Sequence, residues 1–237
     1  MRIIIALIIT IQYILASNVS INPKTMFLNE SKTTQLAISN NSPEPVAYEI
    51  SIVNRSQNQD NTFSNSTEDE NFLIIPSQVL LPPYSNQTVN ITYLKNKIAK
   101  EESFAAEVRQ IHLDLNNKDT KINELLETGS VAQVTVLKNF IKTFFISNSK
   151  FTSNVSIEKS FIKDDKLFVT FLNNGTRNAI FGVNAPLLTI IAKNTEGKLI
   201  NLSRAGIIYA KSKVDFHFSL KGLKIDQGFP ITIKKNN

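Results

Sequence analysis

The stretch TTQLAISNNSPEPVAYEISIV, residues 33–53, decides the fold class. It contains two runs of strand length, 33–40 and 46–53, in which apolar residues alternate with polar ones or follow one another. The residues NNSPEP between them favour a turn. Similar apolar runs recur along the chain, at 72–76, 87–94 and 104–115 among others, and helical periodicity is hard to find. The sequence therefore predicts an all-β protein, and the spacing of the runs favours a sandwich.

A second series of strand-like runs begins after Ile146, where SNSKFTSN interrupts the apolar pattern. The simplest division is two immunoglobulin-like β-sandwich domains at an angle, residues 18–146 and 147–237, each within the ordinary size of a domain. The polar stretch 54–71 contains few apolar residues. We expect it to be a mobile connection rather than packed structure.

The N-terminus indicates export. Met1 and Arg2 are followed by the apolar run IIIALIITIQYILAS, which suits a secretory signal better than a membrane-spanning helix. We expect residues 1–17 to be a cleaved signal peptide. An uncleaved anchor remains the alternative, because Arg2 alone makes a thin basic region.

Composition argues against most chemistry. The 237 residues include 42% apolar and 19% charged residues, and the net charge of +6 comes from basic residues spread along the chain, so no nucleic-acid partner is predicted. There is no cysteine. The two histidines, His112 and His217, come without a nucleophile pattern or a set of metal ligands. We therefore predict no enzyme, metal, cofactor or small-molecule substrate.

The run VTVLKNFIKTFFIS, residues 134–147, is apolar enough for a strand but contains Lys138 and Lys142. A single lysine in such a position most simply extends its ammonium group into water from the end of a strand. From the residues alone, that is the preferred interpretation of Lys142.

Several segments together resemble the periplasmic chaperones of chaperone–usher pilus assembly, over nearly the whole chain after the signal segment. The similarity lies in their order and spacing more than in any one motif. They are VSINPKTMF (19–27), the stretch 33–52, FLIIPSQVLLPPYSNQTVNITY (72–93), ESFAAEVRQIHLDL (102–115), FIKTFF (140–145) and VTFLNNGTRNAIF (169–181).

The resemblance implies a periplasmic protein that binds pilin-like subunits and delivers them to an outer-membrane usher. In that family two basic residues hold the C-terminal carboxylate of the subunit, and by position they correspond to Lys24 and Lys142. Lysine at position 24 departs from the family's usual arginine and cannot form a bidentate fork.

The resemblance also implies donor-strand complementation, in which a chaperone strand, here about 131–145, completes the sandwich of a subunit. The apolar residues Val134, Val136, Leu137 and Phe140 are the candidates to fill the subunit's groove. Their register is open. Counting back from Lys142 without a gap puts Gln133, Thr135 and Leu137 on the groove face, and a bulge would exchange the two faces.

Two further features depart from the family pattern. The loop at 116–130 is long, which suggests the long-loop or a divergent branch. Ile146 stands where many members have an arginine that pairs with an acidic residue near Glu101, so an interdomain ion-pair network is in doubt.

One prediction concerns self-association. An exposed donor strand would pair with itself when no subunit is bound, so we expect a two-fold homodimer through this strand and the segment Ile21–Phe27.

The alternative function is a secreted or surface-anchored adhesion or structural protein, because two immunoglobulin-like sandwiches would serve it as well. Neighbouring genes for an usher and for small β-rich subunits would favour the chaperone.

Overall fold

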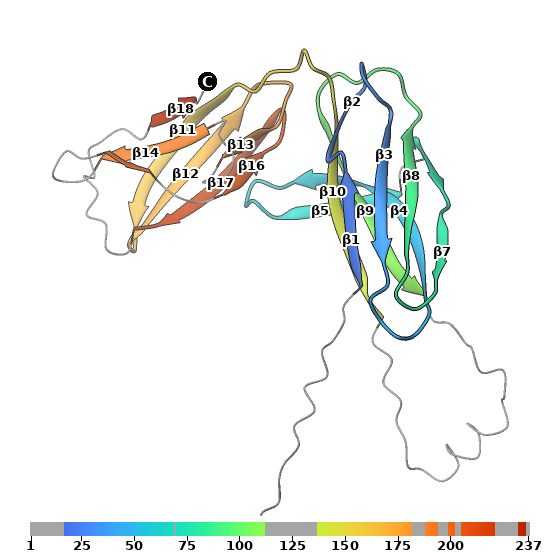
Figure 1. Cartoon of the computed structure of the whole chain (residues 1–237). Helices are drawn as coiled ribbons and strands as arrows, with labels where there is room; N and C mark the ends of the chain where they lie inside the picture. The colour runs from blue at the N-terminus through green and yellow to red at the C-terminus, as the bar shows by residue number, and fades with distance from the viewer. Residues whose placement is uncertain are drawn as a thin grey trace, which may run out of the picture.

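The computed structural model describes residues 17–68, 70–111, 137–181, 188–193, 199–201, 205–220 and 232–235. Every regular element among them is a strand, and the strands form two sandwiches set at an angle to each other (Figure 1). The predicted all-β class with two sandwich domains is confirmed. No helix in the described part of the chain has the length and apolar character needed to cross a membrane. Residues 1–16 of the predicted signal peptide, His112 and the loop 116–130 lie outside the described residues.

Two antiparallel sheets and one parallel pairing build the first sandwich. One sheet has the order β1-β3-β8-β6 and the other β2-β10-β9-β4-β5, with β7 also paired to β4. The strands are β1 (Asn18–Asn22), β2 (Thr25–Phe27), β3 (Thr33–Ser39), β4 (Val46–Gln57), β5 (Phe63–Glu68), β6 (Phe72–Ile75), β7 (Gln78–Leu81), β8 (Asn86–Tyr93), β9 (Glu102–Ile111) and β10 (Asn139–Ser147).

The second sandwich has a three-stranded sheet, β11-β12-β17, and a sheet with the order β15-β14-β13-β16 to which β18 adds by pairing with β14. Its strands are β11 (Val155–Lys163), β12 (Lys166–Asn173), β13 (Ala179–Phe181), β14 (Leu188–Lys193), β15 (Leu199–Asn201), β16 (Gly206–Ile208), β17 (Ser212–Ser219) and β18 (Thr232–Lys235).

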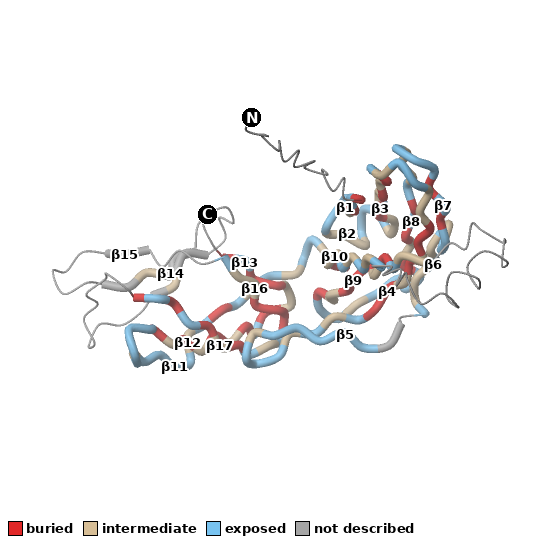
Figure 2. The backbone as a smooth tube through the Cα atoms, turned by 90° about the horizontal axis from the view of Figure 1, so that it is seen from below, coloured by how far each residue is buried: buried red, intermediate tan, exposed pale blue. Residues whose placement is uncertain are grey.

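Alternation of side chains builds a separate core in each sandwich. In β3 the inward residues Thr34, Leu36 and Ile38 are buried, and the residues between them are more exposed. They meet apolar residues of the opposite sheet, such as Ile52 and Phe104, in one continuous core. The second core forms in the same way around the aromatic residues of β12, β13 and β17. Figure 2 shows the buried residues of the two sandwiches as separate groups.

A buried asparagine organises the same kind of turn in each sandwich. The Asn40 amide donates to the carbonyls of Glu44, Leu81 and Pro82, and its oxygen accepts the N–H and hydroxyl of Ser42. Asn40 is fully buried, as is Asn173 of the second sandwich, and the hydrogen bonds of each satisfy the polar groups of a turn that covers a core.

Asn173 has the same role in the second sandwich. Its amide bonds three carbonyls and its oxygen accepts two backbone N–H groups, one of them from Gly175. Gly175 is required by close approach, because a Cβ there would lie 2.3 Å from the carbonyl oxygen of Thr152.

The prediction for 54–71 is wrong. β4 continues to Gln57 and pairs with β5, and the two strands form a hairpin that extends from the first sandwich (Figure 1). The stretch needs few apolar residues, because its backbone pairs within the hairpin and its polar side chains bond to one another and to the second sandwich. The polar composition of residues 54–71 therefore belongs to a hairpin that contacts the second sandwich, not to a mobile connection.

Candidate functional site

The candidate site is the open edge of β10. On one side β10 pairs with β9 from Asn139 to Ile146 without a register shift. On its other side it pairs with β2, in parallel, only from Phe145 to Ser147. Among the described residues no strand is bonded to this second side of β10 before Phe145. The edge is therefore open upstream of β2 and closed by it downstream.

The side chains of this segment separate into two faces. Phe144 and Ile146 lie in the core, and Phe140 packs against it and meets the ring of Tyr48 edge-on at 6.2 Å. Leu137 and Ile141, which alternate with them, are 51% and 47% exposed. Of the four predicted donor residues, Leu137 thus points outward and Phe140 lies on the core side. Val134 and Val136 lie outside the described residues.

The structure brings the two predicted lysines to the same place on this edge. Lys142 is half-buried and lies opposite Ala106 of β9. Lys24 is exposed, and its carbonyl accepts the N–H of Phe145 at 2.9 Å. Because β2 pairs Thr25 with Phe145, the same register extended by one residue puts Lys24 beside Phe144. Lys24 is then one diagonal step from Lys142.

Neither lysine is neutralised in the part of the chain that the structure describes. The three ion pairs found there, Arg109–Glu49, Arg177–Glu101 and Lys213–Glu158, do not include them, and no side-chain hydrogen bond of either is present. The point where β2 closes the edge of β10 therefore has two ammonium groups with no described counter-charge.

Beside this edge, a network centred on Glu101 joins the two sandwiches. The Glu101 side chain is buried and accepts hydrogen bonds from the Ser147 hydroxyl and, at 3.3 Å, from the N–H of Asn178. Arg177 of the second sandwich places its Nε 3.8 Å from the carboxylate. Ile146 instead lies in the core. An interdomain ion pair thus exists at Glu101, with its cation from Arg177 and not from position 146.

The sequence analysis did not identify Arg177, although it lies two residues after Gly175 of the asparagine–glycine turn of the second sandwich. Its pairing with Glu101 depends on how the two sandwiches meet, and the backbone N–H of Glu101 donates to the Thr176 carbonyl at 2.7 Å in the same contact. No local pattern in the sequence carries that information.

Burial raises the pKa of Glu101, and its hydrogen bond from Ser147 and the charge of Arg177 oppose the shift. Because the folded pKa lies above the ordinary value, the folded state binds a proton on Glu101 more tightly than the unfolded state does. Proton binding by Glu101 therefore contributes fully to the free energy of unfolding when the pH is below the ordinary carboxyl pKa of 4.5. This contribution is lost as the pH rises through the raised pKa of the folded state.

We expect Glu101→Gln to reduce this pH dependence, because an amide keeps an acceptor for Ser147 but does not titrate. Chemical denaturation at a series of pH values between mildly acidic and neutral measures it. The free energy of unfolding of the wild type should fall more steeply with rising pH than that of the variant, and the exposed Glu30→Gln should follow the wild type. Equal slopes for wild type and Glu101→Gln would contradict the prediction.

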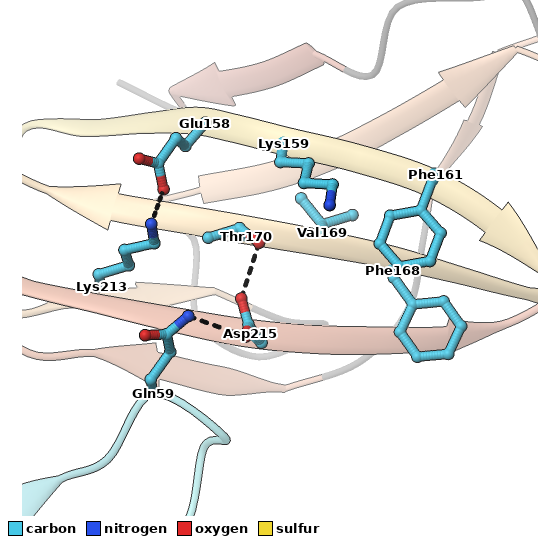
Figure 3. A pocket seen from close by; sticks show the side chains of 9 residues that line it. All are labelled: Gln59, Glu158, Lys159, Phe161, Phe168, Val169, Thr170, Lys213 and Asp215. Atoms are coloured by element: carbon cyan, nitrogen blue, oxygen red, sulfur yellow. Dashed lines mark hydrogen bonds and ion pairs between the residues drawn. The ribbon is translucent and has the colours of Figure 1, made fainter.

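A hollow also lies on the outer face of the sheet β11-β12-β17 (Figure 3). The side chains that line it mostly satisfy one another. Lys213 pairs with Glu158, the Thr170 hydroxyl donates to Asp215 at 2.7 Å, and Phe161 stacks on Phe168 at 5.0 Å. His217 lies across from Phe168 on the same face. No predicted site residue lines this hollow.

Comparison with known proteins gives a fold and no sequence family. No protein-family model matches the chain, and no curated protein matches it. Solved structures do match over almost the whole chain, with low sequence identity.

Three of these structures are fimbrial chaperones, each with a TM-score of 0.53. A chaperone–tip adhesin complex of CFA/I fimbriae biogenesis has 16% identity and covers 93% of this chain and 100% of its own. The class 5 fimbriae chaperone CfaA has 15% identity with the same coverage. The CsuC–CsuE chaperone–tip adhesion subunit complex from Csu pili of Acinetobacter baumannii has 13% identity and covers 91% of this chain and 97% of its own. The chain thus has the two-sandwich fold of the chaperone–usher fimbrial chaperones.

Proposed function

We propose that this protein is a periplasmic chaperone that binds pilin-like subunits by adding β10 to their incomplete sandwich. The observation that carries the proposal is the edge of β10, which is open upstream of Phe145 and closed by β2 beside Lys24 and Lys142. The fold shared with fimbrial chaperones supports it.

An open strand edge binds another strand through its backbone. Unpaired N–H and C=O groups recruit a further strand, and side chains that alternate along the edge enter pockets of the partner. Here Leu137 and Ile141 are the outward apolar side chains. Phe140, with its ring against Tyr48, anchors the strand to its own core. We propose Leu137 and Ile141 as the donor residues. By alternation Val134 and Val136 fall on the opposite face, and they join the donor residues only if a bulge before Leu137 exchanges the faces.

The position of β2 supports our proposal for where the subunit's chain ends. A client strand that runs parallel to β10 on the open edge meets β2 at Phe145 and cannot continue. If that strand is the last of the subunit, its C-terminal carboxylate lies against Lys24 and Lys142. Two ammonium groups at a partly desolvated edge give charge-assisted hydrogen bonds, which are stronger than neutral ones. The same argument rejects an antiparallel client strand, whose N-terminus would lie there.

The remaining parts of the proposal rest on the resemblance and on the apolar N-terminal segment. They are removal of residues 1–17 on export, residence in the periplasm and delivery of the subunit to an outer-membrane usher. Binding and release need no bond chemistry, so we propose a binding protein without catalytic activity.

The test uses a short soluble peptide in which valine alternates with serine, prepared with a free C-terminal carboxylate and with a C-terminal amide. We expect the carboxylate form to bind about tenfold tighter or more, because a hydrogen bond to a charged group contributes about 1.5 to 3 kcal/mol. Isothermal titration calorimetry at low salt measures both affinities. Equal affinity of the two peptides would contradict the carboxylate site, and binding of neither would contradict the open-edge proposal.

A further inference from the structure

The hairpin of β4 and β5 reaches from the first sandwich onto the second. Figure 1 shows it extending toward β16 and β17, and Figure 2 shows β5 as a largely exposed arm alongside the second sandwich. The turn of this hairpin is internally braced. Asp60 accepts both the N–H and the hydroxyl of Thr62, and the N–H of Asn58 donates to the carbonyl of Thr62 at 2.9 Å. A turn fixed by these bonds can restrict the position of the second sandwich as well as contact it.

Gln57, the last residue of β4, makes the main polar contact. Its Nε2 donates to the carbonyl of Ile207 at 2.7 Å, and its Oε1 accepts the N–H of Tyr209 at 2.9 Å. The side-chain amide therefore bonds to the chain at the end of β16 as a neighbouring strand would. Both halves of the amide are used, so an isosteric change of either half breaks at least one bond. A further bond from Nε2 to Asn61, at 2.9 Å, fixes the amide in this orientation.

Tyr209 links this contact to the candidate site. It is 8% exposed, and its ring lies between Phe63 of the hairpin, at 5.7 Å, and Phe145 of β10, at 6.2 Å. Phe145 in turn donates its N–H to the carbonyl of Lys24. A continuous series of contacts thus runs from Gln57 through Tyr209 and Phe145 to the place where β2 closes the edge.

The tip of the hairpin adds a second attachment. The backbone carbonyl of Gln59 accepts the N–H of Asp215 at 2.6 Å. The Nε2 of the Gln59 side chain donates to the Asp215 carboxylate at 3.2 Å. Figure 3 shows Gln59 reaching the β17 strand from outside the second sandwich. Two attachments on one braced arm restrict rotation between the sandwiches more than either does alone.

We propose that Gln57 is a positioning residue, which holds Tyr209 against Phe145 and so keeps the second sandwich in the one orientation in which the edge of β10 and the two lysines accept a client. The inference rests on the proposed function, which says what the edge binds. It adds that affinity for the client depends on an amide in a part of the chain remote from that edge. A residue of merely structural role would change stability without changing client affinity.

The orientation is tested without any client. Because the chain has no cysteine, the exposed residues Ser20 and Ser160, one in each sandwich, can be changed to cysteine and spin-labelled, and the distance between the labels measured by pulsed electron paramagnetic resonance. We expect a narrow distance distribution in the wild type. Gln57→Glu, which sets a carboxylate oxygen against the Ile207 carbonyl, should broaden it.

The matched control is Gln35→Glu, the same change at an exposed amide of β3, where the nearest bond is to Asn90 within the same sheet. It should leave the distribution narrow. Gln57→Met, which keeps the length of the side chain and removes all three bonds of the amide, is a second variant if Gln57→Glu lowers the unfolding temperature. An unchanged distribution in the folded Gln57 variants would overturn the proposal.

Client affinity is then measured with the carboxylate peptide. If the competent orientation falls to about a tenth of the population, the apparent affinity falls about tenfold. A broadened distribution with unchanged affinity would overturn the positioning role. Lys142→Ala separates this inference from the proposed function, because it should lose the peptide and keep the narrow distribution. If the wild type binds no peptide, the proposed function fails and the positioning role falls with it, while the distances still report whether Gln57 braces the two sandwiches.

Discussion

Lys142→Ala is expected to weaken binding of a client's C-terminal strand by about 30-fold to several thousandfold. Removing one partner of a desolvated, hydrogen-bonded charge pair costs about 2 to 5 kcal/mol, and each 1.4 kcal/mol is about a tenfold change in affinity. The large effect comes from the carboxylate that stays behind, held against an edge where the second cation, Lys24, is more exposed to water. Lys24→Ala should act in the same direction.

Affinity for the carboxylate peptide and retention of subunits in pull-down experiments measure the effect. Lys166→Ala, at an exposed lysine of the second sandwich, controls for the loss of net charge. The amide peptide should bind wild type and Lys142→Ala about equally, since it lacks the charge that the lysine serves. Thermal unfolding should be little changed, because no described ion pair or side-chain hydrogen bond of Lys142 is lost. Undiminished binding by both alanine variants would show that no carboxylate is held there.

The sequence predicted those parts of the fold that depend on local alternation. In β3 and β8 apolar residues occur at every second position, and the sheet buries that face of both strands. Turn residues predicted where the strands end for the same local reason. The pairing of Lys24 with Lys142 was predicted from the resemblance to the chaperones. The placement of the two lysines near each other depends on the parallel pairing of β2 with β10, which no pattern within either strand indicates.

The errors and omissions arise where the two sandwiches meet. The polar segment 54–71 reads as mobile because its hydrogen-bond partners, including the backbone of Ile207 and Asp215, are distant in sequence. Arg177 and Glu101 were not paired in advance for the same reason. A polar residue that bonds across a domain junction resembles, in the sequence, one that faces water. Composition distinguishes core residues from surface residues, but it does not distinguish residues that face water from residues at the junction of the two sandwiches.

Leu137→Glu and Ile141→Glu are each expected to weaken client binding and self-association together. The open edge of β10 is a liability for pairing between molecules, so we predict that the free protein forms a two-fold dimer through it. Among the described residues β1 and β2 are edge strands, each paired on one side only, so the segment Ile21–Phe27 offers an unpaired edge to the dimer in addition to that of β10. Either partner must then cover Leu137 and Ile141, which are about half exposed in the free chain.

Full burial of a leucine or isoleucine contributes about 1.5 to 3 kcal/mol, and about half of that is gained here because each side chain is already half covered. Burying the glutamate charge in its place costs further free energy, so the glutamate variants should lose about tenfold or more in affinity for the peptide. The loss should be larger for the dimer, because a two-fold interface contains each substitution twice. Sedimentation velocity at increasing protein concentration measures the dimer, and the carboxylate peptide measures client binding. Leu73→Glu is the matched control, at a strand residue of the first sandwich that is 48% exposed and lies on β6, in the opposite sheet. A wild type that stays monomeric well above micromolar concentration, or a variant that loses the peptide and keeps its dimer, would show that the two partners do not share this edge.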